Sequence, residues 1–222
     1  MTEISSRGLL FDLDGVLVDS TPAVSRVWTE WAREHGFDPV DVVRHAHGRP
    51  SIATIRHFIP DADHELENLR VENLEIADVG GVVALPGARE LLASLPPDRW
   101  AVVTSGTRPL AETRIRAAGL PLPARMLTAN DIAHGKPDPE PYLKGAKLLG
   151  FAAGDCVVFE DVPAGVRSGK AAGARVVAFR TTFPDVELRA AGAAWIVNGC
   201  ESVSIIDAAH NTEMRLALNT NH

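Results

Sequence analysis

The chain has 222 residues, of which 45% are hydrophobic and 23% are charged, an ordinary composition for a globular protein. This length suits one large domain, or a domain with an insert, and suffices to bury a hydrophobic core without disulfides or metals. A net charge of -7 and the lack of any Lys/Arg run argue against general binding to nucleic acid or to an anionic membrane.

Two features bear on where the protein works. The opening residues MTEISSRGLL contain no apolar stretch long enough for a signal peptide, and no segment approaches the length of a membrane span. Cys156 and Cys200 lack the spacing of a metal-ligand pair, so we interpret them as free, buried thiols in a reducing compartment. We therefore expect a cytoplasmic protein, and we expect it to be a monomer.

The first informative segment is Phe11–Ser20, which reads FDLDGVLVDS and continues the apolar run Gly8–Phe11. Asp12 and Asp14 lie two residues apart, a spacing at which side chains leave a strand in the same direction. Two neighbouring carboxylates repel each other unless a divalent cation or a shared proton separates their roles. The segment therefore suggests a metal, an anionic substrate and acid/base chemistry, although Asp and Gly also occur together in ordinary loop starts.

Residues 21–79 have no comparable strand pattern. Apolar side chains recur there at helical spacing, at Val24, Val27, Trp28 and Trp31 and again at Leu66, Leu69 and Leu74. Thr21-Pro22 has the composition of a helix start, and Pro60 that of a helix break. We predict a small helical cap domain, residues 19–84, inserted into a core domain made of residues 1–18 and 85–222.

The rest of the chain alternates between apolar runs and helical segments. The runs are continuous, as in strands covered on both faces, and occupy 100–103, 125–128, 156–159, 175–179 and 194–197. The helical segments occupy 110–118, 140–149, 163–172 and 185–191, each followed by a glycine suited to a C-terminal cap. This order predicts the α/β class, with a Rossmann-like parallel sheet covered by helices. We expect the tail after about His210 to fray.

Polar residues follow four of these strands, at the edge where open α/β sheets place their sites. They are Asp12 and Asp14, then Thr104-Ser105-Gly106, then Lys136, then Glu160-Asp161. A carboxylate can attack phosphorus and hold the phosphoryl group, provided that Mg²⁺ and a lysine neutralise the charge. A threonine hydroxyl and backbone N–H groups near a helix start can bind phosphate oxygens. The set therefore suits phosphoryl transfer.

Each of these residues also has an ordinary interpretation. Thr104 could cap a helix, Lys136 could be a solvated loop lysine, and Glu160-Asp161 could serve a helix dipole. Three histidines of the insert could form a second metal site, but their spacing favours surface or pocket-lining positions; they are His45, His47 and His57. We interpret the insert's tryptophans as packing residues, one of which touches the substrate cavity.

The motifs DLDG, TSG, GKP and ED, in this order, resemble those of the haloacid dehalogenase superfamily, in the branch that contains β-phosphoglucomutase and many small-metabolite phosphatases. The segments ANDIAHGKPDPEPYLKGAKLLG and VVFEDVPAGVRSGKAAG are similar to those of sugar and polyol phosphatases, such as 2-deoxyglucose-6-phosphatase and glycerol-phosphate phosphatase. The resemblance covers nearly the whole chain, cap included. It implies a Mg²⁺-dependent phosphatase acting on a small sugar or polyol phosphate.

The resemblance also implies a role for each motif residue. Asp12 would be the nucleophile that forms an aspartyl-phosphate, and Asp14 the general acid and then the general base. Thr104 and Lys136, with the backbone of Ser105 and Gly106, would bind the phosphoryl group. Mg²⁺ would be held by the Asp12 side chain, the Asp14 carbonyl and Asp161, and Glu160 would be a ligand or would orient a water on the ion. In the cap, Arg49 is our candidate for a specificity contact.

Other functions are compatible with parts of this pattern. A β-phosphoglucomutase-type mutase is the main alternative, although Val24 stands where such mutases carry a cap histidine, and His47-Gly48-Arg49 where they carry a lysine near a glycine. A cap without lysine does not fit phosphonate cleavage through a Schiff base. A phospho-accepting receiver or regulatory module, the non-enzymatic alternative, would have no helical insert after its first strand.

Overall fold

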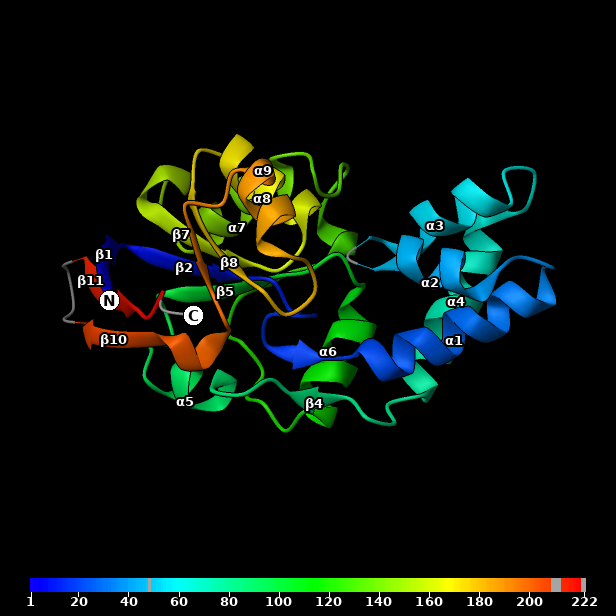
Figure 1. The fold of residues 1–222 in the computed structure, drawn as a ribbon, viewed down its shortest axis with the longest axis horizontal. Helices are drawn as coiled ribbons and strands as arrows, with labels where there is room; N and C mark the ends of the chain where they lie inside the picture. Colours follow the sequence, from blue (N-terminus) through cyan, green and yellow to red (C-terminus); the bar gives the residue numbers. More distant parts are fainter. Residues whose placement is uncertain (48, 209–212, 221–222) are drawn as a thin grey trace.

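The computed structural model describes residues 1–47, 49–208 and 213–220, so Gly48 and His210 lie outside the described part. Its centre is a six-stranded parallel sheet with the order β6-β5-β2-β7-β8-β9 (Figure 1). The strands are β2 (Gly8–Phe11), β5 (Trp100–Val103), β6 (Met126–Leu127), β7 (Cys156–Glu160), β8 (Arg175–Phe179) and β9 (Trp195–Val197). The predicted parallel α/β core is confirmed, and all six predicted strands are present.

Helices cover both faces of this sheet, and successive side chains of β2 pack against helices on opposite faces. Leu9 and Phe11 pack with residues of α5 (Ala88–Ala93) and α6 (Arg108–Ala117) on one face. Leu10, between them, packs on the other face with α7 (Glu140–Leu148), α8 (Pro163–Ala171) and α9 (Asp185–Ala191). Successive side chains of a strand point to opposite faces, so a strand with helices on both sides must be apolar throughout.

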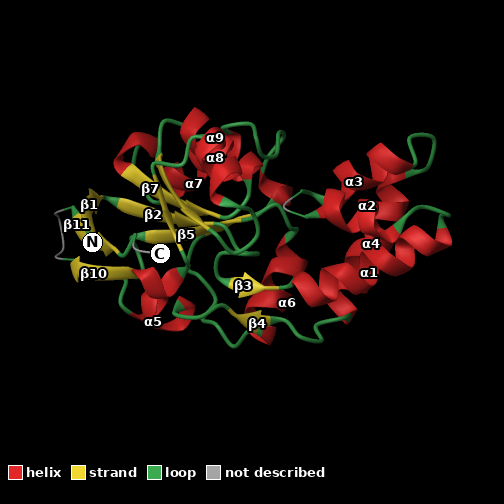
Figure 2. Cartoon of the chain, viewed as in Figure 1, coloured by secondary structure: helices red, strands yellow, loops and turns green. Residues whose placement is uncertain are grey.

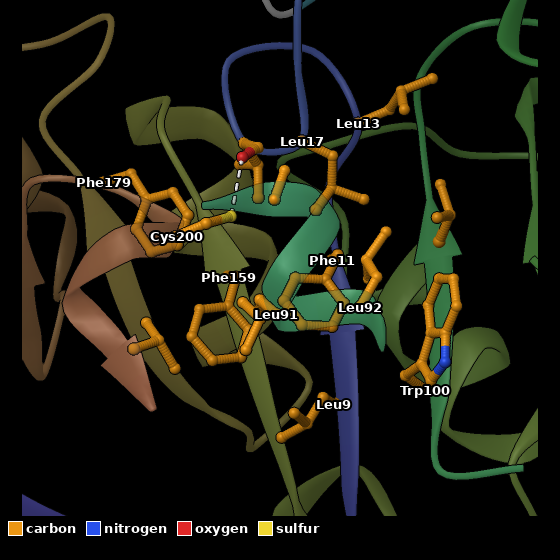
Figure 3. Packing of buried hydrophobic residues seen from close by; sticks show 14 of the residues in the cluster. Leu9, Phe11, Leu13, Leu17, Leu91, Leu92, Trp100, Phe159, Phe179 and Cys200 are labelled. Atoms are coloured by element: carbon orange, nitrogen blue, oxygen red, sulfur yellow. Dashed lines mark hydrogen bonds between the residues drawn. The ribbon is translucent and has the colours of Figure 1, made fainter. Parts of the chain in front are cut away.

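The first of these two clusters contains the aromatic centre of the core (Figure 3). Phe11 stacks on Phe159 of the neighbouring strand with ring centroids 4.7 Å apart, and Trp100 meets Phe11 edge-on. The thiol of Cys200 lies in the same cluster and donates to the carbonyl of Val16. Both cysteines are free and buried, as the sequence predicted.

A second, antiparallel sheet joins the two ends of the chain, in the order β1-β11-β10. Its strands are β1 (Thr2–Ser6), β10 (Val203–Asp207) and β11 (Met214–Leu218). The prediction of a fraying tail is therefore wrong for β11, where Met214, Leu216 and Leu218 are fully buried. Burial of these apolar side chains stabilises the strand, and its long-range partner β1 is not visible in the local sequence pattern.

Four helices form a separate module between β2 and the rest of the sheet: α1 (Thr21–Glu34), α2 (Pro39–Ala46), α3 (Ser51–Phe58) and α4 (His64–Ala77). They enclose their own hydrophobic cluster around Trp28 and Trp31. The short strands β3 (Val18–Asp19) and β4 (Val83–Ala84) pair as an antiparallel ribbon where the chain enters and leaves the module (Figure 2).

The start and end signals of these helices are local. Asp38 and Asp63 precede α2 and α4, and their carboxylates accept from backbone N–H groups of the first turn. In α4 the predicted helix is present, but Leu66, Leu69 and Leu74 are exposed, while Val71 and Glu75 are buried. In the described part of the chain, no helix combines the length and apolarity that crossing a membrane requires.

Candidate active site

The predicted phosphoryl-transfer residues meet at the carboxyl edge of the parallel sheet. One pocket is lined from the core by Asp12, Asp14, Thr104, Ser105, Gly106 and Asp161. Arg49, between α2 and α3, lines the same pocket from the helical module, and Trp28 contributes from α1. The acids follow β2 and β7, and the Thr104 loop follows β5, the neighbour of β2 on its other side. Adjacent parallel strands thus bring together residues that lie far apart in sequence.

Lys136 connects two of the acids beneath this pocket. Its Nζ lies 2.9 Å from Oδ1 of Asp12 and 2.6 Å from Oε1 of Glu160, and it donates to the carbonyl of Val103. Its side chain is only 2% exposed, so Lys136 is not a solvated loop lysine. Burial lowers the pKa of Lys136, but the charges of Asp12 and Glu160 outweigh burial and hold the pKa above its ordinary value.

Glu160 uses both carboxylate oxygens within the protein. Besides Lys136, Oε1 accepts from the hydroxyl of Tyr142 at 2.7 Å. Oε2 accepts from the backbone N–H groups of Asp161 at 3.0 Å and Val162 at 3.3 Å. Its side chain is completely buried. These contacts fix Glu160 as the acid that positions Lys136 and the following turn.

Asp161 is only partly satisfied. Its Oδ2 accepts from the hydroxyl of Thr182 at 2.5 Å, whereas its buried Oδ1 has no hydrogen-bond partner among the described residues. Ligand oxygens of Asp12, Glu160 and Asp161 all lie within 4.8 Å of one another. Burial raises the pKa of Asp12 to about 7 and raises that of Asp161 well above its ordinary value, where the charges of Glu160 and Asp12 add to the effect.

These observations test whether a divalent cation fits. Three buried carboxylates lie around one lysine, and one carboxylate oxygen finds no hydrogen-bond partner among the residues that the structure describes. Buried acids of this kind are stable when a cation is coordinated between them. The donors are all oxygen, which is the ligand type that Mg²⁺ prefers. The residues present therefore fit a hard divalent cation.

Asp14 is held on the other side of the pocket. Its Oδ1 accepts from the hydroxyl of Ser20 at 2.5 Å, and its Oδ2 lies 2.9 Å from Nη1 of Arg114 in α6. The second guanidinium nitrogen of Arg114 lies 3.4 Å from Glu75 in the cap helix α4. Burial opposes the charge on Arg114, but Asp14 and Glu75 hold its pKa above the ordinary value. The sequence alone does not predict the positions of Arg114 and Glu75, because a charged residue in a helix carries no signal of burial.

The remaining predicted residues differ in how firmly they are placed. Thr104 is buried, and its Oγ1 accepts a hydrogen bond from the N–H of Gly106 at 3.0 Å. Thr104 does not cap a helix, because the residue that precedes α6 is Thr107. Arg49 is exposed, and its guanidinium lies 3.2 Å from Nε2 of His45.

Of the three histidines considered as a second metal site, only His47 lines the pocket. His45 stacks on His57 at 4.2 Å. Within the described residues, none of the three belongs to a group that could hold a metal ion. This agrees with surface or pocket-lining positions.

Comparison with known proteins agrees with this geometry. Hexitol phosphatase A of Escherichia coli (strain K12) is 50% identical over 177 residues, which cover 78% of this chain and 82% of that protein. Glycerol-1-phosphate phosphohydrolase 2 and 2-deoxyglucose-6-phosphate phosphatase 2, both of Saccharomyces cerevisiae, are 37% and 36% identical. The alignment with the glycerol-1-phosphate phosphohydrolase covers 88% of this chain and 83% of that protein. The alignment with the 2-deoxyglucose-6-phosphate phosphatase covers 95% of each protein.

Solved structures share the fold. A haloacid dehalogenase family hydrolase from Deinococcus radiodurans, solved with bound phosphate and sodium, has a TM-score of 0.65 at 26% identity, covering 88% of this chain and 92% of that one. The β-phosphoglucomutase of Clostridium difficile has a TM-score of 0.77 at 18% identity, with the same coverage, which reflects the fold alone. A family model of haloacid dehalogenase-like hydrolases matches residues 7–173. The chain therefore belongs to the haloacid dehalogenase-like hydrolases, as its four motifs predicted.

Proposed function

We propose that this protein is a Mg²⁺-dependent phosphatase that hydrolyses a small sugar or polyol phosphate through an aspartyl-phosphate on Asp12. Its curated relatives are named for hexitol, glycerol-1-phosphate and 2-deoxyglucose-6-phosphate substrates. The observation that carries the proposal is the meeting of Asp12, Lys136 and Asp161 in one buried cluster beside the Thr104 loop. Such a cluster suits attack by a carboxylate on an anionic ester.

The reaction would use Asp12 and Asp14 in sequence. A carboxylate oxygen of Asp12 forms a bond to phosphorus while the bond from phosphorus to the substrate oxygen breaks, and Asp14 gives its proton to that leaving oxygen. Asp14 then takes a proton from water, whose oxygen forms a bond to phosphorus while the bond from phosphorus to Asp12 breaks, which releases inorganic phosphate and returns the Asp12 carboxylate. The contacts of Asp14 with Ser20 and Arg114 fix the orientation of its carboxylate, which supports its role as the base towards water.

Phosphate binding would fall to Thr104, Lys136 and the backbone N–H groups of Ser105 and Gly106. Lys136 touches Asp12 directly, so its charge lies next to the oxygen that would attack. In the protein without substrate, the hydroxyl of Thr104 accepts from Gly106 and thereby holds the loop in shape. A phosphate oxygen would accept a hydrogen bond from the hydroxyl of Thr104, whose O–H that contact leaves free to donate.

Mg²⁺ would be held by the side chain of Asp12, the carbonyl oxygen of Asp14 and Asp161. When bound, the ion would neutralise charge on the transferring phosphoryl group. The partner-free Oδ1 of Asp161 supports its role as a ligand. Glu160 could bind Mg²⁺ directly or orient a water molecule on the ion. Its four hydrogen bonds to the protein favour the second role.

We further propose that residues 19–84 act as a cap on a core of residues 1–18 and 85–222. The separate hydrophobic cluster of α1–α4 and the ribbon β3–β4 support this division. Closure of the cap would exclude water from the site, and Arg49 would contact the substrate from the cap side. A monomeric state and a cytoplasmic location stay predictions.

The test is phosphate release from a panel of hexitol, glycerol and hexose phosphates, with and without Mg²⁺. We expect release from several of them and none after EDTA treatment. β-Glucose 1-phosphate with a bisphosphate primer separates hydrolase from mutase. Formation of glucose 6-phosphate without net phosphate release would replace the phosphatase by the mutase alternative. A phospho-accepting receiver would become phosphorylated without turnover.

A further inference from the structure

Three charged side chains, the half-buried Asp14 and the buried Arg114 and Glu75, connect the core to the cap along the pocket wall. Asp14 pairs with Nη1 of Arg114 at 2.9 Å, and Nη2 of Arg114 lies 3.4 Å from Oε2 of Glu75. Arg114 belongs to α6 of the core and Glu75 to α4 of the cap, and both line the pocket. The side chains of Arg114 and Glu75 are only 7% and 6% exposed. The proposed reaction gives Glu75 no task.

Glu75 is held in a fixed orientation but retains spare hydrogen-bonding capacity. Its Oε1 accepts from the indole N–H of Trp28 at 3.1 Å, and its Oε2 faces Arg114. A carboxylate offers about four acceptor positions, of which these contacts use two. Burying a charged carboxylate is costly unless it is paired and hydrogen-bonded, so further donors to a buried carboxylate stabilise it. The spare positions on a pocket-lining carboxylate therefore point to a ligand that donates hydrogen bonds.

The charges of Asp14, Arg114 and Glu75 also favour a ligand that donates hydrogen bonds. Among the described residues, one guanidinium serves two carboxylates, those of Asp14 and Glu75, so the two acids share a single cation. Burying such an uncompensated charge is costly unless a bound partner satisfies it. A hydroxyl group leaves the charge unchanged but stabilises it, because it donates a hydrogen bond to a carboxylate and accepts one from a guanidinium.

We propose that Glu75 and Arg114 together recognise a hydroxyl group of the substrate, with Glu75 as acceptor and Arg114 as donor. The inference rests on the proposed phosphatase function and specifies which part of the substrate is recognised. Asp14 acts at the leaving oxygen, and Arg114 contacts Asp14 directly. The recognised hydroxyl is therefore carried by a carbon close to the phosphorylated one, as in a 1,2-diol monophosphate.

The same geometry disfavours substrates with a second negative group near that position. A phosphate or carboxylate facing Glu75 would meet a like charge in a buried site, where repulsion is stronger than in water. Monophosphates of neutral polyols and sugars therefore fit this wall of the pocket better than sugar-acid phosphates or bisphosphates do. Rejection of this kind contributes to specificity as much as attraction does.

The experiment compares glycerol 1-phosphate with propyl phosphate, which has the same carbon chain without hydroxyl groups. The quantity measured is the ratio of kcat/KM for the two substrates in the wild type and in Glu75→Gln. Loss of a hydrogen bond to a charged group corresponds to roughly ten-fold or more, so we expect the ratio to fall at least ten-fold, mainly through KM for glycerol 1-phosphate.

Two further variants make the result specific. Glu65→Gln removes a carboxylate from the exposed side of the same helix, and the ratio should stay at the wild-type value. Trp28→Phe keeps an aromatic ring in the cap cluster but removes the N–H that orients Glu75, and the ratio should fall in the same direction. Thermal unfolding of each variant checks that the cap remains folded.

The two levels of the proposal fail in different ways. If the wild type releases phosphate from neither substrate nor from the wider panel, the phosphatase function itself is wrong. If the wild type hydrolyses glycerol 1-phosphate and Glu75→Gln leaves the ratio unchanged, the function stands and the hydroxyl contact is overturned. An equal loss of kcat/KM for both substrates also overturns it, because that pattern indicates a structural role for Glu75.

Discussion

A side-chain carbon on Gly165 would lie 1.7 Å from Oε1 of Glu160, far inside any permitted contact. Gly165 is in the first turn of α8, directly above the acid that ends β7. The helix can pass this close only because the position has no side chain. Glu160 can therefore keep its contact with Lys136 while the helix starts immediately after it.

Gly165→Ala should consequently reverse the usual effect of this substitution in a helix. Replacing a helical glycine by alanine normally stabilises by about 1 kcal/mol. Here the methyl group must displace Glu160, and overpacking of a buried site costs typically 1–3 kcal/mol. We expect lower stability in urea unfolding and a loss of phosphate release, since Lys136 loses its fixed position. Arg167→Ala, exposed on the same helix, is the control and should change stability by less than about 0.5 kcal/mol. A more stable, fully active Gly165→Ala protein would contradict this account.

Asp12→Asn should abolish phosphate release while leaving the fold intact. The amide has the shape of the carboxylate and still accepts from Lys136, but it is not a nucleophile. Asp14→Asn should retain more activity, with a fall of roughly 10²–10⁴ typical of a lost general acid/base. Mass spectrometry must exclude deamidation of the new asparagine. Turnover by an undeamidated Asp12→Asn protein would rule out Asp12 as the attacking group.

Metal affinity should depend on Thr182, which donates a short hydrogen bond to Asp161. Outer partners that orient a ligand are worth about 10–100-fold in metal affinity. We expect Thr182→Val to weaken Mg²⁺ binding by that factor in calorimetry, and Thr182→Ser to restore most of it. Mg²⁺ at about 100 times its Kd should also stabilise the wild type by about 2.7 kcal/mol. If the Thr182→Val and Thr182→Ser proteins bind Mg²⁺ as tightly as the wild type, Asp161 does not need the hydrogen bond from Thr182.

The parallel core was predicted from the sequence, and so was the position of Asp12 and Asp161 at the edge of its sheet. Asp12 and Asp161 follow continuous apolar runs, and a buried parallel strand and its polar end both leave a local signal. The pairing of β1 with β11 leaves none, because it depends on contacts between the two ends of the chain. Arg114 and Glu75 were missed for a related reason: each looks like a solvated helix charge until α4 and α6 are brought together.

Thiol reactivity offers a pH test of the core. Burial raises the pKa of Cys156 and of Cys200 to about 12, so only about one molecule in ten thousand carries either thiolate at pH 8. Reaction of the native protein with a disulfide reagent should therefore be very slow at pH 8 and should accelerate as the pH rises. Both thiols should react rapidly once the protein is unfolded in guanidinium. Fast titration of either cysteine in the native protein would place it at the surface.

The antiparallel sheet should prove essential to stability, although it lies away from the pocket. Leu216 is fully buried in β11 and faces the same cluster as Phe11 and Phe159, whereas its neighbour Arg215 is exposed and pairs with Glu3. Leu216→Ala should cost about 2–5 kcal/mol in urea unfolding, the range for truncating a buried leucine. Arg215→Ala should cost less than about 1 kcal/mol, because it loses only a surface ion pair. If both substitutions lower the free energy of unfolding by the same small amount, β11 contributes little to the core. The tail would then fray, as its sequence alone predicts.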